Sequence, residues 1–256
     1  MGTFRFIGLI LVLIHGVRAS AAVFETDDRV AIIAAPGSPL SPVGVVYPAS
    51  KIHYATGFLV DRCHVLTVKH VVGDNKTAQN KMLHFSVGPR PIKGKWTSKG
   101  IVVADGKFMS RQSSHEPGQG RFRDWLLLRL ERCLGDEFGF LRLGSEHPKV
   151  GQLVQSVGFP RDRSLVGPTI DPRCSVRAWV GATVLHDCAS RQGSSGGPIF
   201  KRVRKGSSDV IEVVAMHSAG VPDRGVRPFD YAFSSIAIPI KTIQPLIRPY
   251  LDLNGG

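Results

Sequence analysis

The stretch RQGSSGGPIF, residues 191–200, places Ser195 among three glycines. A serine hydroxyl attacks a carbonyl group when a base takes its proton, an acid group orients that base, and amides stabilise the developing oxyanion. Gly193, Gly196 and Gly197 would let the chain turn sharply near a substrate, because glycine adopts positive φ without steric cost. A Gly/Ser run alone is also typical of a flexible linker or turn. The choice depends on whether a base and an acid group accompany the serine.

Both groups occur earlier in the chain, each at the end of a strand-like run. His70 follows the β-rich segment HVLTVK, and Asp124 directly precedes the apolar run at residues 125–130. A charged group at a strand end can lean into a cleft while its neighbours fill the core. Each residue alone favours a structural role, since an aspartate before a strand is most often a turn former. Together with Ser195 they supply the parts of an activated nucleophile.

The elements that would position these residues are short strands. Apolar runs rich in Val, Ile, Phe and Thr recur between turn residues, and amphipathic helices do not separate them. This pattern is typical of an all-β sandwich or barrel. One short helix is expected in the final segment KTIQPLIRPYL, where Pro245 limits its length. The polar stretch at residues 144–151 is the expected junction between two β halves of about a hundred residues each.

The N-terminal residues have the organisation of a secretory signal peptide. Arg5 provides a positive charge, residues 7–17 form a short apolar core, and residues 19–21 have small side chains suited to cleavage. An apolar run of about eleven residues is shorter than the roughly twenty needed to span a membrane. We therefore expect residues 1–21 to be removed on export. The mature protein would be secreted or periplasmic, without stable membrane insertion.

The chain is strongly basic, with a formal net charge of +13 that falls to +11 when Arg5 and Arg18 leave with the signal peptide. Such a charge favours acidic partners, including anionic glycans, nucleic acid, membrane surfaces and acidic peptides. The basic residues are spread along the chain, and the densest cluster, residues 201–206, coincides with an expected hairpin turn. Nucleic-acid binding is not expected, because it would need a localised basic face.

The blocks LTVKH, DWLLLRL and GSSGGPIF, in the order His, Asp, Ser, resemble those of the chymotrypsin-like serine protease family. The resemblance covers roughly residues 29–250 and includes ATGFLV before the histidine block. It implies two six-stranded antiparallel β-barrels with a short C-terminal helix. Residues 22–146 would form the N-terminal barrel, and residues 147–256 the C-terminal barrel with the helix. The α/β-hydrolase motif G-x-S-x-G is disfavoured, because its acid and histidine follow the serine.

The resemblance implies a role for each candidate. Ser195 would be the nucleophile, His70 the general base and then acid, and Asp124 the group that fixes the imidazole tautomer. The backbone amides of Gly193 and Ser195 would form the oxyanion hole. The implied reaction is hydrolysis of a protein or peptide substrate through an acyl-enzyme. It uses no cofactor and no metal, and the cysteine spacings match no zinc site.

Two positions depart from the animal members of the family. Ser194 stands where zymogen-activated members have an aspartate that pairs with a newly cut N-terminal ammonium. No such switch is expected here, and bacterial members such as the glutamyl endopeptidases are more similar at this point. Lys69 replaces a small residue before the base. We expect its ammonium to face solvent, because lysine is rarely buried unpaired.

The resemblance also suggests the walls of the primary specificity pocket. They would comprise Ser190 and the segment MHSAG, residues 216–220. Ser218 is similar to a serine that hydrogen-bonds the catalytic aspartate. Ala219 and Gly220 would present a strand edge to an extended peptide.

Two further residues bear on substrate choice. Ala189 stands where trypsin-like enzymes have an aspartate, so cleavage after Lys or Arg is not expected. His217 stands where glutamyl endopeptidases have a histidine that binds the substrate carboxylate. Beside Ser190 it would donate a charge-assisted hydrogen bond and give a preference for Glu or Asp. The other interpretation is a buried structural histidine.

Export would place the four cysteines in an oxidising compartment, where three pairings are possible. Cys174 and Cys188 flank a segment the size of a hairpin that would brace the specificity pocket. Cys63 begins the histidine-bearing strand and Cys133 ends the strand after Asp124. If these strands are antiparallel with the catalytic pair at one end, the cysteines meet at the other. We expect disulfides 63–133 and 174–188.

The main alternative function is a catalytically silent protein on the same fold. Its basic surface would bind anionic glycans or membranes. A silent homologue has no reason to keep His70, Asp124 and Ser195 together, so the sequence favours the peptidase. Reaction with a fluorophosphonate would distinguish the two.

Overall fold

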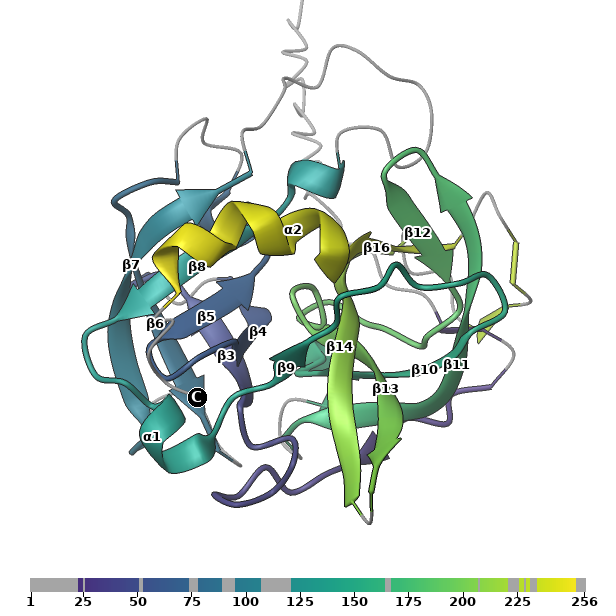
Figure 1. Ribbon diagram of the computed structural model, residues 1–256, viewed down its shortest axis with the longest axis horizontal. Helices are drawn as coiled ribbons and strands as arrows, with labels where there is room; N and C mark the ends of the chain where they lie inside the picture. The colour runs from purple at the N-terminus through teal and green to yellow at the C-terminus, as the bar shows by residue number, and fades with distance from the viewer. Residues whose placement is uncertain are drawn as a thin grey trace, which may run out of the picture.

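The computed structural model describes residues 23–24, 26–50, 53–73, 78–88, 95–106, 121–163, 167–206, 208–220, 226–227, 229–230 and 234–251. The expected signal peptide lies outside these residues. No helix in the described part of the chain is long and apolar enough to cross a membrane. Strands dominate, and they form two units side by side in Figure 1, the earlier strands on the left and the later ones on the right.

The first unit is a closed barrel of six antiparallel strands in the order β3-β4-β5-β8-β7-β6. Large apolar side chains such as Phe58, Phe85 and Leu128 are fully buried in its core. The strands are β3 (Val43–Tyr47), β4 (Ala55–Leu59), β5 (His64–Thr67), β6 (Met82–Val87), β7 (Thr97–Asp105) and β8 (Leu126–Leu130).

The second unit is also a ring of six antiparallel strands, in the order β10-β13-β14-β16-β12-β11, which the β10–β11 pairing closes. The predicted fold class, all-β with two six-stranded antiparallel barrels, is confirmed. The strands are β10 (Leu153–Gly158), β11 (Thr169–Val180), β12 (Thr183–His186), β13 (Pro198–Lys205), β14 (Ser208–Ala219) and β16 (Ser235–Pro239).

Short elements complete the two sheets. β1 (Val23–Phe24) pairs in parallel with β15 (Val226–Arg227), and β9 (Arg142–Leu143) pairs in parallel with β14. β2 (Val30–Ala31) precedes the first barrel in sequence but pairs with β11 of the second. The N-terminal segment therefore lies on the second barrel. A domain boundary between residues 146 and 147 stays a prediction.

The helices are few and short. α1 (Gly135–Phe138) and the 3-10 helices η1 (Lys69–Val72), η2 (Arg121–Arg123), η3 (Arg161–Arg163) and η5 (Arg248–Tyr250) each span one turn. The predicted C-terminal helix is present as α2 (Ile240–Ile247), with Pro245 inside it. Ile240, Ile243 and Ile247 are spaced by three and four residues, so they share one buried face. That face belongs to the main hydrophobic core.

Both predicted disulfides are confirmed: Cys63 pairs with Cys133, and Cys174 pairs with Cys188. β5 and β8 are antiparallel, with His64 opposite Arg129 at one end and Thr67 opposite Leu126 at the other. Cys63 and Cys133 therefore meet at the end away from His70 and Asp124. In the chain-entropy model each closed loop stabilises the fold by about 3–5 kcal/mol.

Candidate active site

His70 and Asp124 come from adjacent strand ends and bind each other twice. Thr67, the last residue of β5, is opposite Leu126, the first residue of β8. His70 Nδ1 lies 2.7 Å from Asp124 Oδ2, and the His70 backbone N–H donates to Asp124 Oδ1 at 2.9 Å. Because the carboxylate accepts a hydrogen bond from the N–H at Nδ1, the other ring nitrogen, Nε2, carries no proton and is left as an acceptor. A side-chain exposure of 39% keeps the ring accessible.

Asp124 is buried and also accepts a hydrogen bond from Ser218 Oγ at 2.6 Å. A β-bulge in the β14–β16 pairing between His217 and Ala219 accompanies this contact at Ser218. Burial alone would raise the pKa of Asp124. Attraction to His70 and the hydrogen bonds from His70 and Ser218 outweigh burial and lower this pKa below its usual value. Asp124 is therefore ionised near neutral pH and can stabilise an imidazolium.

Ser195 lies in the loop between β12 and β13, held between the two barrels. Its carbonyl accepts a hydrogen bond from Thr56 N of β4 at 2.8 Å, and Gly196 N donates to His217 O of β14 at 2.7 Å. Gly196 has φ +87°, and a Cβ there would collide with the Thr56 carbonyl oxygen. The turn around the serine therefore requires glycine, as its sequence suggested.

Ser195 is a partly exposed residue, and no hydrogen bond joins its hydroxyl to the His70 ring within the described residues. Without substrate, catalytic hydrogen bonds are often long and tighten when substrate binds. A sequence of contacts nevertheless links the two residues. The Ser195 loop bonds to His217, the next residue Ser218 bonds to Asp124, and Asp124 bonds to His70.

The peptide group before Gly193 has a defined orientation. Gln192 O accepts a hydrogen bond from Arg161 N at 2.7 Å. In a trans peptide the C=O and N–H point in opposite directions, so the Gly193 N–H points away from Arg161. Gly193 O accepts from Thr56 Oγ1 at 2.7 Å. Neither the Gly193 nor the Ser195 N–H donates a hydrogen bond to the described residues, so both can bind an oxyanion.

The residues proposed for the specificity pocket lie close together. Ser190 and His217 are both buried and line one small cavity, together with Ala189 and Ser194. The Ser190 hydroxyl lies 3.4 Å from the Ser235 hydroxyl. Ala219 pairs with Ile236 of β16, and Gly220 follows at the end of β14.

Sequence reasoning missed His186, which contacts His217. His186 Nε2 lies 3.1 Å from His217 Nδ1. Cys188 N donates to His186 Nδ1 at 3.2 Å, so His186 carries its proton on Nε2 and donates it to His217 Nδ1. His217 is then left with its N–H at Nε2. No motif marks this contact, which exists because β12 and β14 both pair with β16.

Both buried histidines are uncharged. Burial lowers the pKa of His186 to about 3. Burial also lowers the pKa of His217 far below its usual value. The neighbouring imidazoles of His186 and His70 disfavour a positive charge on His217 further, and the Asp124 carboxylate only partly opposes them. The pair is therefore a hydrogen-bond relay between neutral imidazoles.

The expectation that Lys69 faces solvent was wrong. Its side chain is only 4% exposed, and its ammonium lies 2.8 Å from Asp105 Oδ2. It also donates to the Gly106 carbonyl oxygen at 2.9 Å. A partner carboxylate and a carbonyl replace the water that a buried ammonium loses. Lys69 therefore ties the helical turn that carries His70 to the end of β7.

Asp171 is a second group that sequence reasoning did not identify. Its Oδ2 accepts a hydrogen bond from Ala189 N at 2.7 Å, and its Oδ1 accepts from Arg173 N at 3.0 Å. Burial raises the pKa of Asp171 to about 6, although both hydrogen bonds oppose this. Asp171 thus anchors the segment before Ser190 and titrates in mildly acidic solution.

Comparisons with known proteins agree with this architecture. No curated protein matches the chain. Among solved structures, a Glu endopeptidase in complex with MPD is 14% identical, with a TM-score of 0.62, over 90% of this chain and 98% of that one. A serine endoprotease from Yersinia pestis is 16% identical, with a TM-score of 0.54, over 84% of this chain and 67% of that one. At such identities the likeness is one of fold.

The family model gives the assignment. Residues 55–206 match the model described as a trypsin-like peptidase domain. The matched range contains His70, Asp124 and Ser195, and it spans more than half of the chain. The chain belongs to the trypsin-like peptidase family.

Proposed function

We propose that the protein is an exported serine endopeptidase in which Ser195, His70 and Asp124 act as a triad. The observation that carries this proposal is the double hydrogen bond between His70 and a buried, ionised Asp124. It lies beside a glycine turn that presents Ser195 next to two amides available as donors. This combination provides a base, a group that orients it, and an oxyanion site.

In the proposed mechanism His70 Nε2 takes the proton from Ser195 as the hydroxyl oxygen attacks the scissile carbonyl. Asp124 stabilises the imidazolium that forms, and the N–H groups of Gly193 and Ser195 bind the oxyanion. His70 then passes the proton to the leaving amine, which departs as the acyl-enzyme forms. Water, activated by the same imidazole, hydrolyses the acyl-enzyme and restores the Ser195 hydroxyl.

We further propose that a Glu or Asp side chain precedes the scissile bond. The neutral relay leaves His217 with an N–H at Nε2, and His217 and Ser190 line one cavity. A carboxylate would accept this N–H in a charge-assisted hydrogen bond. Ala189 supplies no negative charge for a Lys or Arg side chain. A structural neighbour named as a Glu endopeptidase has the same fold, which supports this choice.

The end of β14 offers the substrate backbone a place to bind. β14 pairs with β13 as far as Met216 and with β16 as far as Ala219. Within the described residues, the β13 side of the chain beyond His217 has no paired strand. An extended peptide would add here by main-chain hydrogen bonds to Ser218 and Gly220.

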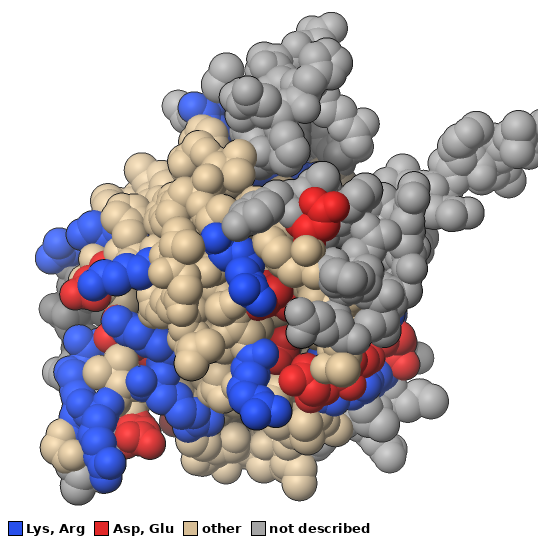
Figure 2. All heavy atoms as spheres, turned by 90° about the vertical axis from the view of Figure 1, so that its right-hand side faces the viewer, with Lys and Arg blue, Asp and Glu red and all other residues tan. Residues whose placement is uncertain are grey.

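Export is proposed from residues 1–21 together with the disulfides. All four cysteines are paired, which is typical of an oxidising compartment. On the face shown in Figure 2, described Lys and Arg side chains occur in several groups with Asp and Glu among them. Among the described residues on this face, acidic side chains lie between the basic groups, which favours the peptidase over a binding protein for polyanions.

A fluorophosphonate probe tests the catalytic proposal. The wild-type protein should be labelled at one serine, and Ser195→Ala should not be labelled. Ser38→Ala, which changes a serine in a turn before β3, should be labelled like the wild type and serves as the control. An unlabelled wild type that still binds heparin would contradict the proposal and support the catalytically silent alternative.

A further inference from the structure

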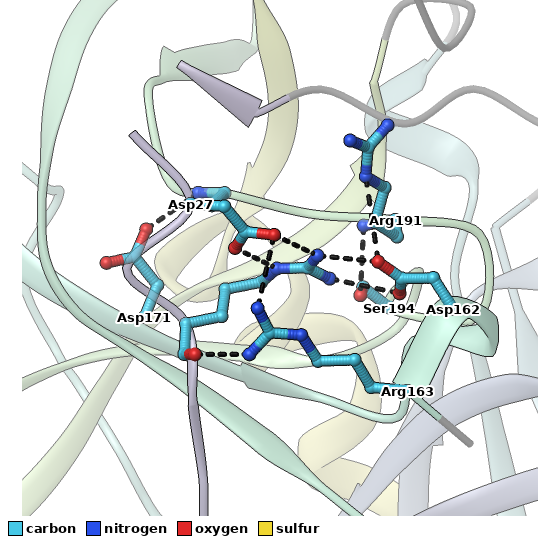
Figure 3. A network of polar contacts seen from close by, with 8 residues as sticks. Asp27, Asp162, Arg163, Asp171, Arg191 and Ser194 are labelled. Atoms are coloured by element: carbon cyan, nitrogen blue, oxygen red, sulfur yellow. Dashed lines mark hydrogen bonds and ion pairs between the residues drawn. The ribbon is translucent and has the colours of Figure 1, made fainter. Parts of the chain in front are cut away.

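A network of charged groups connects the N-terminal segment to the loop that carries Ser195 (Figure 3). Its centre is Arg29, whose side chain is only 2% exposed. The guanidinium binds Asp27 through Nε and Nη2, both at 2.7 Å. It also binds Asp162 through Nη1 at 3.2 Å and Nη2 at 2.6 Å. Arg29 therefore makes two bidentate carboxylate pairs, the strongest geometry for such hydrogen bonds.

Arg163 adds a second connection between the same segments. Its Nη2 lies 3.2 Å from Asp27 Oδ2, and its Nη1 donates to the Arg29 carbonyl oxygen. Asp162 and Arg163 both belong to η3, the turn that follows β10. The N-terminal segment and η3 are thus held together by charged side chains from both sides.

η3 in turn contacts the loop that forms the oxyanion site. Arg161 N donates to Gln192 O at 2.7 Å, and Arg191 Nε lies 3.8 Å from Asp162 Oδ2. A Cβ at Gly193 would collide with the Phe159 carbonyl oxygen just before η3, so the two segments are in close contact. The position of η3 therefore controls the Gln192–Gly193 peptide.

The orientation of that peptide decides whether the oxyanion site exists. If the Gln192–Gly193 peptide rotated, Gln192 O would lose its bond to Arg161 N, and the Gly193 N–H would turn out of the site. Ser194 carries no charge to prevent this, and within the described part of the chain its Oγ accepts a hydrogen bond from Arg191 N at 3.3 Å. The Arg29 network reaches this part of the loop through Asp162, which pairs with Arg29 and lies 3.8 Å from Arg191 Nε.

We propose that Arg29 is a positioning residue for the oxyanion site, acting through Asp162 and η3. This inference rests on the proposed function, because it assigns the network a role in the same reaction. The network holds η3 against the loop, and η3 holds the Gln192 carbonyl so that the Gly193 N–H faces the substrate. Displacing a catalytic donor by about 1 Å can lower the rate by about 100-fold.

The test compares variants at both ends of the ion pair. Arg29→Met removes the guanidinium and its charge but keeps an unbranched stem of similar bulk, and Arg29→Lys keeps the charge but loses the bidentate geometry. Asp162→Asn breaks the same ion pair from its other end. Because the Asp162 side chain is 41% exposed, this substitution should disturb the fold less than one at Arg29. Arg62→Met is the matched control, since Arg62 forms an exposed bidentate pair with Asp136 far from the loop.

Kinetics should separate positioning from general destabilisation. With a chromogenic acidic peptide, kcat should fall about 10- to 100-fold in Arg29→Met and Asp162→Asn, with KM within about threefold. Arg29→Lys should recover part of kcat, and Arg62→Met should stay within about twofold of the wild type. Affinity for a peptide aldehyde, whose adduct places an oxygen in the oxyanion site, should fall by a factor similar to kcat.

Hydrogen exchange gives a readout that needs no activity. Amides of residues 187–197 should exchange faster in Arg29→Met and Asp162→Asn, and at the wild-type rate in Arg62→Met. Unchanged kcat and exchange in folded Asp162→Asn would overturn the inference, whatever happens to Arg29→Met. Failure of the wild type to react with a fluorophosphonate would contradict the proposed function instead. The hydrogen-exchange rates of residues 187–197 would then decide by themselves whether the Arg29 network orders the loop.

Discussion

His186 and His217 lie on strands that flank β16, with 3.1 Å between Nε2 of the first and Nδ1 of the second. Both rings are buried and uncharged, and the amide of Cys188 fixes the direction of their shared proton. A substrate carboxylate would meet the N–H of His217 Nε2 rather than a cation. Removing either ring should therefore alter substrate choice more than the chemical step.

His217→Ala should reduce the preference for Glu over Gln before the scissile bond. Hydrogen bonds to a charged group contribute about 1.5–3 kcal/mol, so kcat/KM for the Glu peptide should fall roughly 10- to 100-fold. The value for the Gln peptide should change far less. A peptide-library digest measures both, with His84→Ala, a change on the first barrel, as control. Equal losses for both peptides would favour a structural role for His217.

Asp124→Asn should lower kcat about 10⁴-fold, because an amide no longer selects the tautomer with the proton on His70 Nδ1. The pKa of Asp124 is lowered in the fold, so its carboxylate stabilises the folded state above the unfolded pKa. This contribution is lost as pH falls through the folded value. The free energy of unfolding of the wild type and of Asp124→Asn can be measured with denaturant at pH 7 and at pH 3. The amount by which the wild type is the more stable should be smaller at pH 3. A kcat within tenfold of the wild type would exclude the assigned role.

Lys69→Met should destabilise the protein by about 3 kcal/mol, because it leaves the largely buried Asp105 carboxylate without its partner. The double variant Lys69→Met/Asp105→Asn should recover most of that loss, since no unpaired charge remains. Urea unfolding of the two single variants and the double variant measures the coupling. Additive effects of the two substitutions would contradict the pairing.

Asp171 should make the stability of the fold depend on pH. Its folded pKa of about 6 is above the unfolded value, so the protonated form stabilises the folded state. This contribution is complete below pH 4 and is lost as pH rises to 6, by up to about 3 kcal/mol. The wild type should become less stable relative to Asp171→Asn over this range in denaturant titrations. A difference that is constant with pH would show that the carboxyl does not titrate there.

The sequence predicted the features that depend on local pattern. Short apolar runs between turn residues gave the strands of both barrels, and the order of the cysteines along β5 and β8 gave the first disulfide. The turn at Ser195 was also recognisable, because Gly196 packs where no side chain fits. The strands and the turn are local features, and the disulfide, although it joins residues 70 positions apart, followed from the positions of its cysteines at the ends of two strands expected to be antiparallel.

Contacts between distant segments were not predictable in the same way. Lys69 was expected in solvent because its partner Asp105 ends a strand 36 positions later. His186 and His217 meet only through a shared neighbour, β16, and Asp171 reaches Ala189 only once β11 lies beside that loop. Arg29 and Asp162 are separated by 133 positions. The sequence around a buried charged residue does not indicate which residue of opposite charge will pair with it.

The pairing of β2 with β11 has a consequence for how the protein assembles. Val30 leaves the ribosome early, yet its partner Ile170 is made only after the whole first barrel. Joining residues so far apart closes a long loop, and such contacts form slowly. The segment around Val30 is therefore among the last described parts of the fold to reach its native place, although it is synthesised before either barrel.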